Sequence, residues 1–199
     1  HILNLLRFPT EFEVDLPEGE LRELEREAQY YGLSEILQSA RLISLPEIAA
    51  TSAGYHTSSV DPHNYRTYFT YGQEVLQVAC RGWNVLLINP KTTKVVSQST
   101  FDTYVDEYSV HRFVAFLSQV PTGTIVVLAV FDEFGKSTTN NPDFRSALHS
   151  CGGSGSLIEE SSSFAMIGCK GLAPGLAAEA YSVGGSVSVV RPAATSYKW

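Results

Sequence analysis

The sequence predicts an α+β protein in which a short N-terminal helical segment precedes a mixed, β-sandwich-like domain with two helices. Residues 18–31 place apolar side chains at three- and four-residue steps, which is typical of an amphipathic helix. Residues 124–131 form a continuous β-branched apolar run, which is typical of a central buried strand. Strand-like segments mixed with two helical ones after residue 65 fit an α+β sandwich-like domain.

The first helix is expected to begin near Glu18, since acidic residues in a first turn suit the positive end of the helix dipole. Gly32 is expected to end it. Ser34 is expected to cap a second helix, which Pro46 ends. The apolar side of the first helix is formed by Leu21, Leu24, Ala28 and Tyr31.

Residues 46–67 are rich in Ala, Ser, Thr and His, so we interpret them as a linker. The following domain is placed at residues 68–191, before a tail at 192–199. Gly152–Ser156 is interpreted as a flexible connector within it. We expect strands at 74–80, 83–89, 94–99, 124–131, 163–169 and 183–190, and helices at 109–119 and 142–149.

Composition narrows the function classes. The net charge of −7 argues against a general nucleic-acid binder, and no apolar stretch is long enough to span a bilayer. Because the first residue is His1, we expect the chain to be a fragment or a processed product.

The cysteines bear on the compartment. Cys80, Cys151 and Cys169 are an odd number, so at least one thiol is unpaired. Cys80 and Cys169 lie in apolar, strand-like contexts, which favours buried free thiols, with a disulfide as the alternative. No Asn-x-Ser/Thr glycosylation site occurs. We therefore expect a cytoplasmic protein and keep a secreted one as the alternative.

No catalytic or metal-binding motif is present. None of the five histidines belongs to an HExxH or Cys-His cluster. Gly153-Ser154-Gly155-Ser156-Leu157 fails as a nucleophile elbow, because no strong apolar strand precedes it. It also fails as a phosphate loop, because no Gly-Lys-Ser/Thr follows. We expect a non-enzymatic protein without a cofactor or a metal.

Asp132-Glu133 ends the expected central strand. From the residues alone, solvation or loop capping is the commoner role for such a pair, and ligand binding is the alternative.

Three ordered motifs carry a family resemblance: Arg81-Gly82-Trp83-Asn84-Val85, Phe101-Asp102-Thr103-Tyr104, and Phe164-Ala165-Met166-Ile167-Gly168-Cys169-Lys170-Gly171. This set resembles the ILEI/PANDER-like (FAM3) domain. That family includes secreted cytokine-like proteins, modules of hyaluronan-handling proteins, and the stem domain of an O-mannose N-acetylglucosaminyltransferase. The resemblance implies structural roles for Gly82, Asn84, Phe101, Asp102, Phe164, Gly168, Lys170 and Gly171.

The resemblance also implies a candidate carbohydrate site at Arg81, Asp132, Glu133 and Ser161. An Asp accepts from two sugar hydroxyls, and a guanidinium donates in a fixed fork. The alternative is an Arg81–Asp132 ion pair that orders the domain edge. One departure counts against sugar binding, because Ser161 stands where sugar-binding members carry an Arg, and Phe164 where they carry a Trp.

The first 45 residues carry a second resemblance. Ile2-Leu3-Asn4-Leu5-Leu6-Arg7 and Glu27-Ala28-Gln29-Tyr30-Tyr31-Gly32-Leu33 resemble the C-terminal half of a BTB/T1-type (KCTD-like, potassium channel tetramerisation) domain. This implies that the full-length parent is a homo-oligomer. The combined expectation is an adaptor that oligomerises through residues 1–45 and presents a domain that binds a glycan or a protein. A secreted cytokine-like or lectin-like module is the alternative.

Overall fold

The computed structural model describes residues 18–32, 45–61, 63, 65–78, 80–106, 108–155 and 159–193. The chain divides into two compact units, His1–Ser44 and Leu45–Trp199.

In the first unit, helix α2 (Glu18–Tyr30) confirms the first expected helix. Leu24 is 3% exposed and Ala28 is fully buried, so these two positions of the predicted apolar side are confirmed. Tyr31, in contrast, is exposed. Gly32 follows the helix in the left-handed region with φ 67°, as expected of a C-terminal stop. The second expected helix lies outside the described residues.

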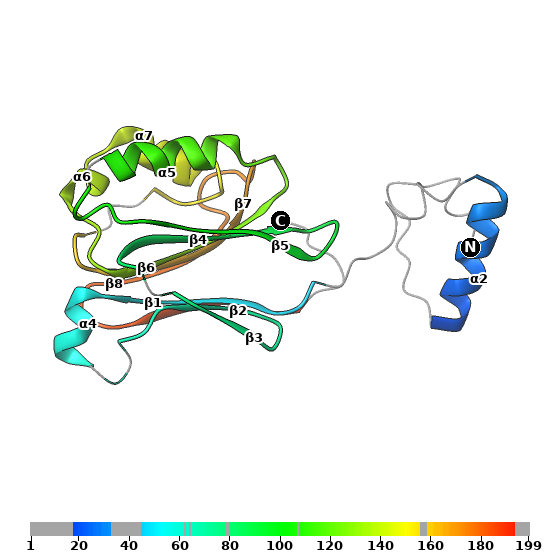
Figure 1. Cartoon of the computed structure of the whole chain (residues 1–199), viewed down its shortest axis with the longest axis horizontal. Coiled ribbons are helices and arrows are strands. Elements are labelled where there is room, and N and C mark those ends of the chain that lie inside the picture. The colour runs from blue at the N-terminus through cyan, green and yellow to red at the C-terminus, as the bar shows by residue number, and fades with distance from the viewer. Residues whose placement is uncertain are drawn as a thin grey trace. The chain divides into compact units, whose positions relative to one another are not determined.

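The second unit is a sandwich of two sheets with helices over one outer face (Figure 1). Its described strands are β1 (Ile48–Gly54), β2 (Tyr68–Tyr71), β3 (Glu74–Gln77), β4 (Gly82–Asn89), β5 (Lys94–Phe101), β6 (Ile125–Asp132), β7 (Ser163–Cys169), β8 (Ala178–Ser182) and β9 (Val187–Arg191). Its described helices are α4 (Tyr55–Val60), α5 (Tyr108–Gln119), α6 (Lys136–Thr139) and α7 (Pro142–His149).

The first sheet has the order β5-β4-β6-β7-β8, with antiparallel neighbours throughout. Residues 125–130 of β6 are all buried, because the sheet is covered on both faces. The predicted central buried strand is therefore confirmed. The expected strands at β4 and β5 and the expected helices at α5 and α7 also appear within two residues of their predicted bounds.

The second sheet has the order β3-β2-β1-β9, again antiparallel. Its centre is β1, which falls inside residues 46–67, so the predicted linker is wrong. After Ile48, the run Ala-Ala-Thr-Ser-Ala-Gly has only small side chains. A Cβ at Gly54 would overlap the backbone of Ser162. Small residues with low strand propensity therefore form this strand, and they conceal it from a pattern-based prediction.

Two hydrophobic clusters separate the layers. One lies between the helices and the first sheet, with Trp83 in edge or tilted contact with four phenylalanines. The other lies between the two sheets and includes Ile48, Phe69 and Val127. The last two residues of β1 pair in parallel with the end of β6, which joins the sheets at one end. The ends of several strands therefore meet there.

Two further expectations need correction. Strands β2 and β8 had no predicted counterpart, and the last expected strand is shortened to β9. The predicted flexible connector is ordered over Gly152 and Gly153, which are buried. Gly152 accepts from Ala177, and Gly153 accepts from Gly175, so this turn is held against the segment before β8.

Candidate ligand-binding site at the joined strand ends

The topology gathers the four predicted ligand residues at the end where the sheets join. Gly82 pairs with Phe131 across β4 and β6, so Arg81 and Asp132 are the next positions along the same pair of strands. Asp132 also pairs with Gly54 of β1. Ser161 reaches the same place from the segment before β7, where its hydroxyl donates to Glu133 Oε1 at 3.1 Å. We call Tyr65, Arg81, Tyr104, Asp132, Glu133 and Ser161 the strand-end cluster.

Asp132 is held in place by a neighbouring tyrosine. The hydroxyl of Tyr65 donates to Asp132 Oδ1 at 2.7 Å. The Tyr65 ring also contacts Phe131, with centroids 5.2 Å apart. Burial raises the pKa of Tyr65, and the hydrogen bond and charge of Asp132 raise it further. Tyr65 therefore stays a protonated donor, and one carboxylate oxygen of Asp132 has a fixed partner.

Two non-glycine residues of the cluster adopt the left-handed backbone region. Asp132 has φ 59° and Ser161 has φ 63°. Such conformations cost about 1–3 kcal/mol each and persist only where the surroundings impose them. The backbone of Ser161 is bonded as well, since its carbonyl accepts from His56 N–H at 3.3 Å. The cluster therefore contains strained residues of the kind that gather at binding sites.

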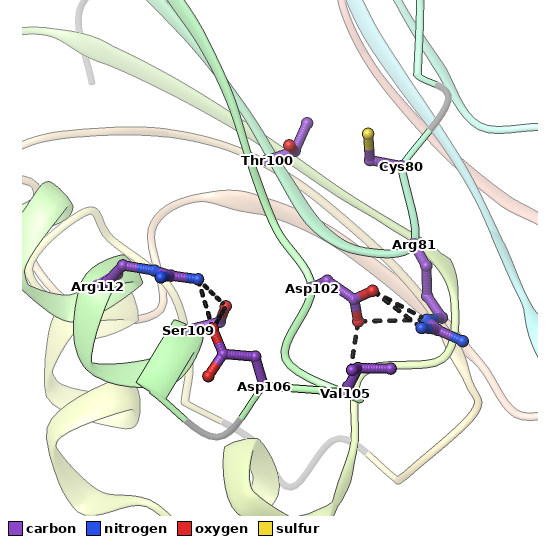
Figure 2. A pocket seen from close by; sticks show the side chains of 8 residues that line it. All are labelled: Cys80, Arg81, Thr100, Asp102, Val105, Asp106, Ser109 and Arg112. Carbon is purple, nitrogen blue, oxygen red and sulfur yellow. Dashed lines mark hydrogen bonds and ion pairs between the residues drawn. The ribbon is translucent and has the colours of Figure 1, made fainter.

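The guanidinium of Arg81 binds Asp102 rather than Asp132 (Figure 2). Arg81 Nη2 lies 2.9 Å from Asp102 Oδ2, and Nε donates to Oδ1 at 3.2 Å. The predicted Arg81–Asp132 ion pair is therefore wrong. The reason is local, because Asp102 directly follows the neighbouring β5 and its carboxylate faces the arginine. The hydrogen bond to Asp102 is the largest cause that raises the pKa of Arg81, and the more distant Asp132 adds to it.

Tyr104 completes the cluster. The Arg81 guanidinium carbon lies 4.8 Å from the Tyr104 ring centroid, within range of a cation–π contact. The charge of Glu133 raises the pKa of Tyr104, and the hydrogen bond that the Tyr104 hydroxyl donates to the Glu133 carboxylate raises it further. The ring is 47% exposed, so a ligand can reach it. Asp132 and Glu133 are half-buried. The cluster thus offers solvent one aromatic ring, one guanidinium and two carboxylates.

An open groove of about 440 Å³ lies beside the cluster and shares Arg81 with it (Figure 2). On its far side, Arg112 Nη2 lies 2.6 Å from Asp106 Oδ2 and donates to Ser109 Oγ. The groove is lined by Cys80, Arg81, Thr100, Asp102, Val105, Asp106, Ser109 and Arg112.

The residues predicted to be structural all have packing or bonding roles. Asp102 accepts from the backbone N–H of Tyr104 and Val105, so its carboxylate braces the loop after β5. Asn84 donates to the carbonyls of Cys80 and Gly82. Lys170 Nζ donates to Ser150 Oγ at 2.8 Å. The three glycines have conformational or steric roles: Gly82 and Gly171 have positive φ, and a Cβ at Gly168 would overlap Cys151 O. Phe101 and Phe164 pack in the aromatic cluster.

The cysteines differ in part from expectation. All three are free, as favoured, and Cys169 is buried, but Cys80 is exposed. Within the described residues, no three His, Cys, Asp or Glu side chains lie close enough to hold a metal ion. None of the described helices has the length and apolarity that crossing a bilayer requires.

Sequence reasoning did not find Tyr65 as a site residue, and it assigned no binding role to Tyr104. Tyr65 was placed in the linker. The only signal for it is an aromatic residue near the end of the predicted linker, where the pattern turns to strands.

Comparisons with known proteins match the segment that contains most of this site. Residues 81–172 match the family model described as Interleukin-like EMT inducer. The chain is also 35% identical over 74 residues to Protein FAM3D of Homo sapiens. That alignment covers 37% of this chain and 31% of FAM3D, so the chain spans about a third of that relative. The family match supports an ILEI/FAM3-type domain and begins at Arg81. The BTB/T1-type resemblance of residues 1–45 therefore stays a prediction.

Proposed function

We propose that the second unit is a recognition module that acts by binding, and that the strand-end cluster binds a carbohydrate. The observation that carries this proposal is the cluster's arrangement. Two half-buried carboxylates, each fixed by a hydroxyl donor of the protein, lie next to an exposed tyrosine ring that contacts an arginine. A sugar presents hydroxyl donors beside an apolar ring face, and this set complements both.

The fixed hydrogen bonds support the proposal energetically. Sugar binding in water exchanges hydrogen bonds with solvent for hydrogen bonds with protein, so each contact contributes only about 0.5–1.5 kcal/mol, or up to about 3 where a charge takes part. A carboxylate already held by Tyr65 or Ser161 loses little freedom when a ligand binds. Ser161 cannot replace a charged donor, so we expect weak binding that depends on Asp132 and Arg81.

A glycan array probed with the purified full chain tests this function. We expect selective hits that Asp132→Ala removes, because that change deletes the acceptor and frees Tyr65. Tyr104→Ala should weaken the same hits by removing the exposed ring. Asp143→Ala, in the first turn of α7, is the matched control and should leave them intact. An array without hits, or hits that survive Asp132→Ala, would exclude the carbohydrate assignment.

The similarity to FAM3D favours a second candidate, a secreted cytokine-like module that binds a protein receptor. In this case the charged strand ends would contact a receptor surface, and the cytoplasmic expectation would fail. Expression of the native gene in cultured cells, followed by immunoblots of medium and lysate, separates the two compartments. Recovery only from the lysate would count against the secreted candidate.

We also propose that the protein is an adaptor, which oligomerises through residues 1–45 and presents the second unit to its ligand. If residues 1–45 oligomerise as a BTB/T1-type segment, each assembly presents several recognition modules, and weak individual contacts add up through avidity. Size-exclusion chromatography with light scattering on the full chain measures the subunit number. A monomer at micromolar concentration would remove the oligomerising role from this segment of the chain.

A further inference from the structure

The segment from the end of β5 to the first residue of α5 carries two tyrosines in an acidic stretch. It reads Asp102-Thr103-Tyr104-Val105-Asp106-Glu107-Tyr108, so Tyr108 is directly preceded by two acidic residues. Neither the recognition site nor the hydrophobic clusters use Tyr108. It is 77% exposed and begins helix α5.

The two tyrosines differ in what surrounds them. Tyr104 is engaged by Arg81 and Glu133. Within the described part of the chain, the hydroxyl of Tyr108 takes part in no hydrogen bond, while its backbone N–H donates to Asp106 Oδ1 at 2.9 Å. Tyr108 is thus a solvent-facing phenol on the first turn of a helix, where the chain opens at low cost.

We propose that Tyr108 is a modification site at which the phenol oxygen becomes the ester of a tetrahedral oxyanion, phosphate or sulfate. Enzymes that esterify tyrosine in folded proteins need an accessible hydroxyl, and many of them favour acidic residues immediately before it. Tyr108 meets both conditions through its exposure and through Asp106 and Glu107. This inference is independent of carbohydrate recognition.

The chemistry is a group transfer from an activated nucleotide. The Tyr108 oxygen attacks the terminal phosphorus of ATP or the sulfur of 3′-phosphoadenosine 5′-phosphosulfate. The new O–P or O–S bond forms as the bond to the nucleotide breaks. The nucleotide leaves with the electron pair, and the phenol proton passes to a base of the transferring enzyme.

The structure also supplies a partner for the new charge. Arg112 lies four residues after Tyr108 on α5, so the two side chains share a helix face. The Arg112 side chain is 64% exposed, and its guanidinium now binds Asp106. An ester on Tyr108 would compete with Asp106 for this guanidinium, as phosphate groups do when they gain arginine contacts. Because Arg112 lines the groove, the modification would change the groove's charge.

The test is to produce the full chain in cultured animal cells by two routes, one cytosolic and one with a secretion leader. Peptides spanning residues 95–112 are then mapped by mass spectrometry with electron-transfer fragmentation. We expect the mass gain of one phosphate or sulfate group on Tyr108 but not on Tyr104. Alkaline phosphatase removes a phosphate and leaves a sulfate, so it identifies the source.

Three variants complete the design. Tyr108→Phe should abolish the mass gain, and Tyr104→Phe should leave it unchanged. Asp106→Asn keeps a good helix cap but removes one acidic determinant, so the modified fraction should fall while the protein stays folded. A gain on Tyr108 in either route supports the proposal and identifies the ester. Absence of the gain in both routes, or equal gain on Tyr104, would overturn it.

Discussion

Asp102 receives hydrogen bonds from two directions. Arg81 donates to its carboxylate from one side, and the backbone N–H groups of Tyr104 and Val105 donate from the other. This residue fixes the ring that the strand-end cluster exposes, because the guanidinium of Arg81 also contacts Tyr104. Single polar side chains at strand ends thus decide the shape of the site.

We predict an acid-dependent loss of stability from Asp102. Burial tends to raise the pKa of its carboxyl, but the hydrogen bond from Arg81 and those from Val105 and Tyr104 outweigh it, so the pKa is lowered. A lowered pKa contributes stability above the unfolded value of about 3.9 that is lost as the pH falls through the folded value. Urea unfolding at several pH values should show Asp102→Asn less stable than wild type at pH 7 and the difference shrinking below about pH 4. A difference independent of pH would contradict this.

Thr93 provides a second test at this scale. It is a β-branched residue at φ 53° in the turn between β4 and β5, where a left-handed residue costs about 1–3 kcal/mol. Thr93→Gly should raise the free energy of unfolding by about 1 kcal/mol, since the greater freedom of glycine in the unfolded chain offsets part of the gain. Thr92→Gly in the same turn is the control and should not stabilise the protein in thermal or urea unfolding.

At the level of elements, β4 and β6 carry the site because their register aligns Arg81 with Asp132. The predicted bounds of both strands were close, since long apolar runs bounded by turn residues indicate strands well. β1 was missed because its small side chains suit a close approach rather than a hydrophobic pattern. The sequence therefore predicts a strand where burial favours large apolar side chains. It does not predict one where a close approach of neighbouring backbone favours small side chains.

Gly82 tests the junction between β4 and the end of β5. It has φ 90°, and a Cβ there would overlap Phe101 O. Gly82→Ala should lower the free energy of unfolding by more than about 3 kcal/mol, because strain and overlap add. Gly175→Ala is the control, with φ 82° and open space around its Cβ, and should cost only about 1–2 kcal/mol. Equal losses in chemical denaturation would show that the overlap is relieved by small shifts.

At the level of the whole molecule, two hydrophobic clusters formed from residues after 44 give the second unit its own core. The three cysteines of the second unit differ in their exposure to solvent. Cys80 is exposed, while burial raises the pKa of the Cys151 and Cys169 thiols. A thiol with a raised pKa and little access reacts slowly at neutral pH.

Thiol titration therefore reports on the intact fold. In the native protein we expect Cys80 alone to react quickly with a chromogenic disulfide reagent, and all three cysteines to react after unfolding. Cys80→Ser should remove the fast phase and leave the other two unchanged. Fewer than three reactive thiols in unfolded wild-type protein would reveal a disulfide and favour an oxidising compartment.

The sequence by itself determined the α+β class, the central strand, the two main helices of the second unit and the motifs that match an ILEI/FAM3-type domain. These features depend on periodicity and on local order, which the chain carries residue by residue. Only the tertiary structure decided that Arg81 pairs with Asp102, that Tyr65 holds Asp132, and that a presumed linker is the strand joining both sheets. Those outcomes are contacts between residues more than twenty positions apart in the sequence. No local sequence pattern predicts which distant segments will lie side by side.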